Sequence, residues 1–293
     1  MYQELRERAK GSARPVVLVN ACTHGHEVVG LDVIDALRSI QITKGTLLFS
    51  VANQRARKQG VAFIESDLNR SFSGNERGTY EEQIASAMMP ALQASDIVID
   101  IHSTNTITQD ADRMLIMTKW DEGIEDIVRV LQPPRVLVME INQNNALISG
   151  AKKGIAFEYG SNEKKTAQKV THDIQKLLQN LEMIPAQSMM SFRPRSLRRA
   201  EKSREPARDD NQKEYLVSRE KRPKVYRVFS PFPKTPNMVL EQGITNFRPI
   251  AKGDIVARKG GESIQAERDF VPILFGENRY TDIFGFMGEE ISV

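Results

Sequence analysis

Short apolar runs alternate with helical patterns through the first 185 residues of this chain. Most of the runs are apolar throughout, as expected for strands that are buried on both faces of a sheet. Segments with apolar residues at helical spacing separate them. The alternation predicts an α/β fold, with a mostly parallel or mixed sheet flanked by helices on both sides. The expected strands are 15–21, 46–52, 96–102, 113–118, 135–140 and 154–160, and the expected helices are 28–40, 80–94, 121–131 and 163–182.

The rest of the chain changes character twice. Residues 193–224 carry 12 Lys and Arg against 6 Asp and Glu, and few of them are apolar. We interpret 186–224 as a charged linker or insertion, because acidic residues are interspersed among the basic ones. Short strand-like runs with Gly, Pro and Asn between them follow. We therefore expect a small β-rich C-terminal domain over 225–293, beside the larger domain over 1–185.

Composition excludes several classes of partner. The formal net charge of +3 is too small to indicate nucleic-acid binding. Cys22 is the single cysteine, so no disulfide can form within the chain, which favours a reducing compartment. The first residues are charged and predict no secretion signal, and no apolar run approaches the roughly 20 residues that cross a bilayer. We expect a cytoplasmic protein with neither nucleic acid nor membrane as partner.

Histidines and carboxylates stand where predicted strands end. The stretch "ACTHGHE" places His24 and Glu27 after the first strand, and "DIHST" places His102 at the end of the third. In open α/β sheets, active sites lie at the carboxyl ends of the strands. Two imidazoles and a carboxylate are a ligand set that catalytic zinc uses, with a fourth position kept for water. From these residues alone, a loop histidine hydrogen-bonded to backbone stays open as the alternative for His24.

Arginines and a further glutamate follow other predicted strands. Arg55 comes after the strand 46–52, and Asn69 and Arg70 occupy the loop "SDLNRSFSG". An arginine offers a planar fork of N–H donors that suits a carboxylate, and it can also stabilise an oxyanion. Glu158 ends the apolar strand of "GIAFEYG". A carboxylate there is costly without a task or a partner, so it is a candidate general base.

Five motifs in one order carry a family resemblance: "THGHE", "NQRARKQG", "DLNRSF", "DIHST" and "FEYGS". They resemble the aspartoacylase / succinylglutamate desuccinylase family, zinc amidohydrolases related to the zinc carboxypeptidases. The resemblance covers residues 15–165, and 225–288 is similar more loosely. Five motifs in order are far more specific than any one of them. The resemblance implies a zinc-carboxypeptidase-like fold with a small β domain, and it suggests a homo-oligomer.

Carried over by position, the resemblance assigns the metal and the catalytic groups. It implies one zinc ion per chain, held by His24, Glu27 and His102. Glu158 matches the catalytic glutamate of the family, and Arg55 matches the arginine that polarises the scissile carbonyl. These assignments imply hydrolysis of an amide bond by metal-activated water.

The resemblance also implies the substrate. Asn69 and Arg70 match the pair that grips an amino-acid carboxylate, and Tyr280 in "ENRY" matches, more loosely, a substrate-contacting tyrosine. The expected substrate is therefore a small N-acyl amino acid. Two alternatives remain: a zinc carboxypeptidase-like peptidase with the same ligands, and a non-catalytic module that binds an anionic ligand through the basic segment.

Several features depart from the family pattern, including Tyr159 and Ser161 beside Glu158, which replace smaller and cyclic residues. His26 stands where the family usually has Asn, and Gln54 stands where it has Pro. Aspartoacylase has an arginine shortly before the catalytic glutamate, but residues 136–158 contain none here. Lys152 and Lys153 are the nearest cations in the sequence, and a lysine cannot reproduce a bidentate fork. This departure argues against N-acetylaspartate as the substrate.

Overall fold

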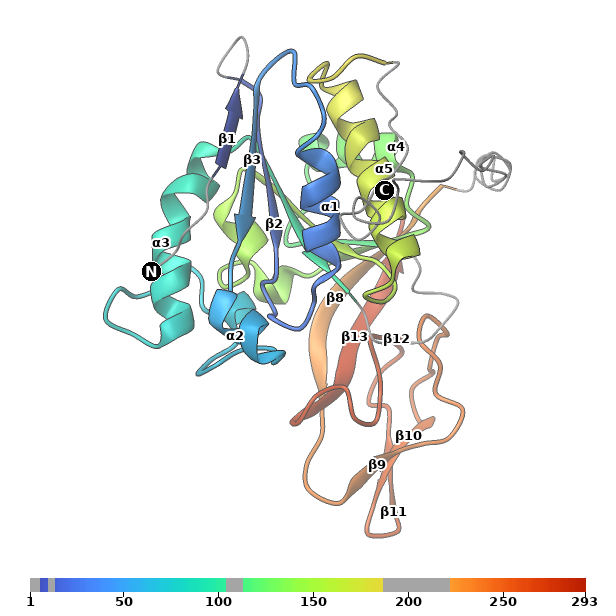
Figure 1. Cartoon of the computed structure of the whole chain (residues 1–293). Coiled ribbons are helices and arrows are strands. Elements are labelled where there is room, and N and C mark those ends of the chain that lie inside the picture. Colours follow the sequence, from blue (N-terminus) through green and yellow to red (C-terminus); the bar gives the residue numbers. More distant parts are fainter. Residues whose placement is uncertain (1–5, 10–13, 104–112, 187–221) are drawn as a thin grey trace, which may run out of the picture.

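Figure 1 shows the computed structural model of the chain, which describes residues 6–9, 14–103, 113–186 and 222–293. A ten-stranded sheet runs in the order β1-β3-β2-β4-β7-β5-β6-β8-β13-β12. Its strands are β1 (Arg6–Ala9), β2 (Val16–Ala21), β3 (Thr46–Val51), β4 (Ile97–His102), β5 (Met114–Met117), β6 (Arg135–Val138), β7 (Lys153–Glu158), β8 (Lys224–Pro233), β12 (Val271–Ile273) and β13 (Ile283–Ile291). The predicted linker 186–224 lies almost wholly outside the described residues.

The central sheet is mixed. Strands β3, β2, β4 and β7 are parallel to one another, while β5 pairs antiparallel with β7 and β6 then runs parallel to β5. The predicted α/β class with a mostly parallel or mixed sheet is thus confirmed. Because four parallel neighbours end at one edge, the residues that follow them meet there.

Helices cover both faces of this sheet (Figure 1). Helices α1 (Val29–Leu37), α4 (Glu122–Leu131) and α5 (Lys164–Asn180) pack on one face, and α3 (Tyr80–Ala94) packs on the other. Strand β2 feeds both layers, since Val17 and Val19 enter one core and Leu18 enters the other. This alternation is the period-two geometry of a strand buried on both faces. None of the helices that the structure describes has the length and apolar character that a bilayer-spanning segment requires.

The C-terminal strands extend the same sheet. Strand β8 pairs parallel with β6, with Lys224 beside Arg135, and β13 and β12 follow as antiparallel neighbours. A separate three-stranded sheet joins β9 (Met238–Leu240), β10 (Ile255–Lys259) and β11 (Glu262–Gln265), at the bottom of Figure 1. The β-rich character of this segment is confirmed, and hydrogen bonding crosses the predicted boundary at residue 224. That 225–293 forms a domain of its own stays a prediction.

Helix α2 (Gln54–Gln59) packs against the loop that follows β2. The Asn53 side chain caps its first turn by accepting from the Ala56 N–H, and the left-handed Gly60 ends it. Gly25 packs directly on this helix, because a Cβ there would lie 2.3 Å from the Ala56 carbonyl carbon. The Gly25 N–H also donates to the Ala62 carbonyl at 2.9 Å. The loop with the candidate metal ligands therefore shares one packed unit with the helix that carries Arg55.

Candidate metal centre and active site

The carboxyl edge of the parallel strands gathers the predicted site residues. His24 and Glu27 lie in the loop after β2, and His102 is the last residue of β4. Glu158 is the last residue of β7 and pairs in register with His102. Adjacent strands lie about 4.8 Å apart, so these two positions are immediate neighbours. Arg55 lies in α2, which follows β3 at the same edge.

The structure brings His24, Glu27 and His102 together. The Nδ1 atom of His24 lies 3.1 Å from Glu27 Oε1, and the Nδ1 atom of His102 lies 2.8 Å from Glu27 Oε2. One ligand atom from each residue lies within 4.8 Å of the others. Ligand atoms bound to zinc at about 2.0–2.1 Å lie about 3.3 Å apart in tetrahedral geometry. The three side chains therefore need only a small adjustment to hold one ion.

Two aspartates hold the other ring nitrogens. The Nε2 atom of His102 lies 2.8 Å from Asp100 Oδ2, and the Nε2 atom of His24 lies 3.2 Å from Asp67 Oδ1. Histidines that ligate metals usually donate their second N–H to a carboxylate, which fixes the ring and raises its basicity. Both imidazoles thus direct Nδ1 toward Glu27 and keep Nε2 for a supporting carboxylate. This donor set fits a zinc ion.

The electrostatics of the group favour a cation. Burial lowers the pKa of His24, but hydrogen bonds to Asp67 and Glu27 outweigh it and raise the pKa to about 9. The pKa of His102 is also raised, because Asp100 and Glu27 overcome its burial. Burial raises the pKa of Glu27, but the two histidines bring it well below its ordinary value. Both Nδ1 atoms therefore face the Glu27 carboxylate, and a divalent cation bound here would replace any protons between them.

The neighbours His26 and Cys22 lie outside this ligand group. The His26 ring stacks on the His24 ring with centroids 6.3 Å apart. The backbone carbonyl of His26 accepts a hydrogen bond from Asn162 Nδ2 at 2.9 Å. Burial raises the pKa of the Cys22 thiol to about 12. Since the thiolate is the form that binds metals, Cys22 is a buried apolar side chain here.

Glu158 is buried beside the three candidate ligands. Burial raises its pKa above the ordinary value; His102 opposes this rise, Glu27 adds to it, and Arg279 opposes it. The Nη2 atom of Arg279 lies 3.7 Å from Glu158 Oε1. Arg279 Nε also donates to the Tyr280 hydroxyl at 3.2 Å. The sequence pattern did not identify Arg279, although it stands next to the predicted Tyr280.

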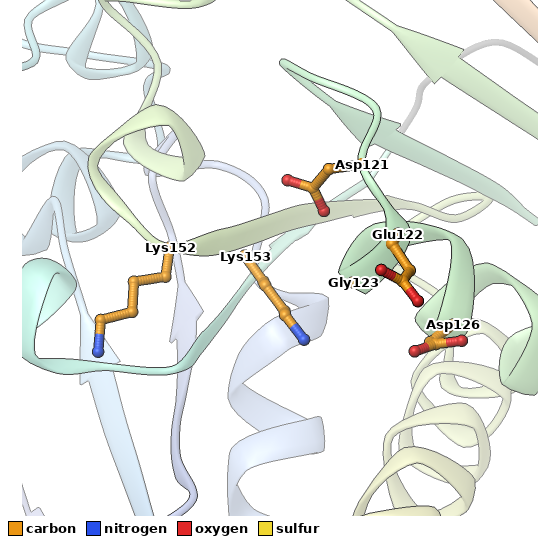
Figure 2. Close-up of a pocket in the computed structure, with 6 residues that line it drawn as sticks. All are labelled: Asp121, Glu122, Gly123, Asp126, Lys152 and Lys153. Atoms are coloured by element: carbon orange, nitrogen blue, oxygen red, sulfur yellow. The ribbon is translucent and has the colours of Figure 1, made fainter.

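The lysines that the sequence offers as cations near Glu158 belong elsewhere. Lys153 begins β7 and Glu158 ends it, so about 16 Å of extended chain separates them. Lys152 and Lys153 instead line an open pocket of about 370 Å³, which Figure 2 shows at the start of α4. The other lining residues are Asp121, Glu122, Gly123 and Asp126. Among the residues that the structure describes, the cation paired with Glu158 is Arg279, in the turn between β12 and β13.

The loop with Asn69 and Arg70 forms a short 3-10 helix, η1 (Leu68–Arg70). Asp67 Oδ1 accepts from the Asn69 N–H at 2.8 Å, and the same atom faces His24. Asn69 Oδ1 accepts from the Leu147 N–H at 3.1 Å, so its Nδ2 group is the part that can meet a carboxylate. Arg70 is exposed and donates from Nη1 to the Asn69 carbonyl at 2.7 Å. Asp67 thus joins this loop to a candidate metal ligand.

Arg55 is exposed and packs on Tyr80, while Tyr280 lies next to Arg279 in the turn before β13. The Arg55 guanidinium stacks over the Tyr80 ring, 4.5 Å from its centroid. Burial raises the pKa of Tyr280, and the charges of Arg279 and Arg70 partly offset that rise. Tyr280 therefore lies near Arg70, and its ring packs edge-on against Phe286.

A buried carboxylate anchors the chain that leads to η1. Glu81, in the first turn of α3, accepts hydrogen bonds from Asn53 Nδ2 and from the N–H groups of 64, 65 and 66. Burial raises the pKa of Glu81, but these donors outweigh it and hold the pKa below its ordinary value. Sequence reasoning missed Glu81, because it looks like an ordinary acidic residue at a helix start.

Replacing Glu81 by glutamine is expected to lower the free energy of unfolding by about 2–4 kcal/mol at pH 7, because an NH₂ group then faces backbone donors. A depressed pKa stabilises the fold above the unfolded-state value near 4.3 and loses this effect as the pH falls. The difference in the free energy of unfolding between wild type and Glu81→Gln should therefore become smaller below about pH 4. Urea unfolding measures it, with the exposed Glu76→Gln as control. An equal effect of both variants would contradict this role.

Comparisons with known proteins identify a family and similar folds. Residues 13–184 match the family model described as the succinylglutamate desuccinylase/aspartoacylase catalytic domain. A search of curated proteins finds no match. Murine aminoacylase 3 has a similar fold, with a TM-score of 0.69 at 18% identity, over 96% of this chain and 97% of that one. Succinylglutamate desuccinylase from Vibrio parahaemolyticus gives 0.65 at 13% identity, over 94% and 82% of the two chains.

An aspartoacylase family protein from Mesorhizobium loti gives a TM-score of 0.62 at 16% identity, over 98% of this chain and 88% of that one. At these identities the solved structures show the fold, and the family model adds the sequence pattern across more than half of the chain. The chain belongs to the succinylglutamate desuccinylase/aspartoacylase family.

Proposed function

We propose that the protein is a zinc-dependent hydrolase that cleaves the amide bond of an N-acyl amino acid. The convergence of His24, Glu27 and His102 beside Glu158 carries the proposal. It combines a zinc ligand set with a carboxylate whose pKa is raised by burial. The family, whose named members cleave N-acyl amino acids, supports the same reaction class.

Glu158 has the chemistry of a general base. Zinc, when held by His24, Glu27 and His102, supplies Lewis-acid polarisation of the acyl carbonyl and lowers the pKa of the attacking water. Glu158 takes one proton from that water as its oxygen bonds to the acyl carbon. The carboxyl group then passes this proton to the amide nitrogen as the C–N bond breaks. The products are a free carboxylic acid and an amino acid.

Arg55 is proposed to meet the developing oxyanion. Its guanidinium can donate to the carbonyl oxygen, and such donors contribute most where charge develops in the transition state. Helix α2, which carries Arg55, packs on Gly25, so the backbone of Arg55 is held next to the loop that contains His24 and Glu27. Release from its stack on Tyr80 would let the side chain turn toward the substrate.

Asn69, Arg70 and Tyr280 are proposed to hold the amino-acid part of the substrate. Arg70 offers a fork of donors for the α-carboxylate, and Asn69 Nδ2 adds a further one. Asp67 links this loop to His24, so the carboxylate grip and the metal ligands keep a fixed relation. Fixed relative positions of this kind supply much of the acceleration in enzymes.

The first test is a substrate panel. Zinc-loaded protein is incubated with N-acetyl and N-succinyl amino acids and with dipeptides, and the released acid and amino acid are measured by mass spectrometry. Release of the acyl acid from N-acyl amino acids supports the proposal. Release of amino acid from dipeptides alone would favour a carboxypeptidase, and no release from any substrate would contradict hydrolysis.

The α-carboxylate should be required for binding. We expect the corresponding α-carboxamide substrates to have KM values about 10–100-fold higher, because a charge-assisted pair contributes about 1.5–3 kcal/mol. Arg70→Gln should remove this preference, whereas Arg77→Gln, at an exposed position before α3, should keep it. An unchanged preference in Arg70→Gln would exclude this residue from carboxylate binding.

A further inference from the structure

Three polar side chains lie side by side within the apolar central strands. Asn20 pairs in register with Ser50 of β3 on one side and with Asp100 of β4 on the other. Asn20 and Asp100 are fully buried, and Ser50 is 1% exposed. Burying three such groups costs free energy unless each is hydrogen-bonded. The row Ser50–Asn20–Asp100 therefore needs an explanation, since apolar residues fill most neighbouring positions of these strands.

The hydrogen bonds in this row have one consistent direction. The Ser50 hydroxyl donates to Asn20 Oδ1. Asn20 Nδ2 then donates to Asp100 Oδ1 at 2.8 Å, and the Thr23 hydroxyl donates to the same oxygen at 2.7 Å. A carboxylate oxygen only accepts, so the opposite orientation of the Asn20 amide would set two acceptors against each other. The Asp100 carboxylate thus fixes the orientation of the amide, and the Ser50 hydroxyl satisfies its oxygen.

The row ends at a candidate metal ligand. With Oδ1 engaged by Asn20 and Thr23, the other carboxylate oxygen of Asp100, Oδ2, faces His102 Nε2 at 2.8 Å. That contact requires the proton of a neutral imidazole to be on Nε2, which leaves the Nδ1 lone pair for a cation. The polar row therefore specifies both the rotamer of Asp100 and the tautomer of His102.

We propose that Asn20 and Ser50 are positioning residues of the metal centre, which act on zinc binding through Asp100 and His102. Neither residue contacts His24, Glu27 or His102. Their influence on zinc binding passes through the hydrogen bonds to Asp100 and from Asp100 to His102. The inference rests on the metal site of the proposed function. It extends that site across three strands of the sheet, to Ser50, which is linked to Asp100 through two successive hydrogen bonds.

The test measures zinc affinity rather than turnover. Metal-free wild type, Asn20→Leu and Ser50→Ala are titrated with zinc against a chromophoric chelator. Loss of partners around metal-bound histidines typically costs 10–100-fold in affinity. We expect about a 10-fold loss in Asn20→Leu and about a 3-fold loss in Ser50→Ala, with wild-type affinity in Ser50→Thr, which keeps the hydroxyl.

The control separates positioning from general destabilisation. Val19→Ala removes buried atoms from the same strand but on its other face. We expect it to lower the free energy of unfolding and to leave zinc affinity unchanged. If affinity instead falls in parallel with stability across all variants, or is equal in all of them, the positioning role is overturned. If wild type binds no zinc, the proposed function falls as well.

Discussion

Glu158→Gln is expected to lower kcat for amide hydrolysis by about 10²–10⁴-fold, the range that general acid–base catalysis contributes. Glutamine keeps the size of the side chain but can neither take the proton of the attacking water nor deliver it to the leaving amine. Because Glu158 is not one of the proposed metal ligands, the variant should bind the same amount of zinc as wild type. Initial rates with N-acyl amino acids and elemental mass spectrometry measure the two quantities.

A matched control sharpens this result. Glu163, at the start of α5, is exposed and makes no side-chain cap. Glu163→Gln should keep the wild-type rate. Glu158 also pairs with Arg279, so unfolding curves should verify that Glu158→Gln is folded. A folded, zinc-containing Glu158→Gln with full activity would show that another group is the base.

His102→Ala should lose both zinc and activity. The His102 ring lies between the carboxylates of Glu27 and Asp100. Its removal deletes one proposed ligand and leaves these two buried carboxylates without the imidazole that separates them. We expect the zinc affinity to fall by more than about 100-fold, which exceeds the usual cost of losing only a supporting partner. Zinc content after dialysis and hydrolysis rates report the loss.

His26→Ala provides the matched histidine control. His26 lies two residues from His24, and its ring packs against the His24 ring. It should keep close to one zinc per chain. If His26→Ala lost zinc and His102→Ala retained it, the ligand assignment would be wrong.

Sequence reasoning predicted the strand ends well, because the signals there are local. His102 and Glu158 each end an apolar run, and a polar residue at that point marks the carboxyl edge of a buried strand. The same locality explains why the buried strands and the long amphipathic helices were expected. Helix α2 was missed because its six residues have no apolar period, although Asn53 and Gly60 are its capping signals.

Contacts between distant segments could not be predicted in this way. Arg279 meets Glu158 because the C-terminal strands continue the central sheet past β6, and no local pattern encodes which strand β8 joins. The contacts of Asp67 with His24 and of Glu81 with Asn53 also join segments that no local sequence pattern relates. These supporting residues are ordinary acidic residues in sequence and acquire their roles from tertiary packing.

The carboxylate of Asp67 has a thermodynamic consequence. One oxygen atom serves both the Asn69 N–H of the substrate loop and the His24 imidazole. A change in the free energy of one contact alters the other, so the proposed metal binding and the order of this loop would form a linked equilibrium. Linkage is reciprocal: if bound metal raises the affinity for a ligand that orders η1, that ligand raises the affinity for the metal by the same factor. With unchanged association rates, the metal then dissociates more slowly by that factor. In the proposed zinc site, metal retention would thereby be a cooperative property of the metal and the substrate together.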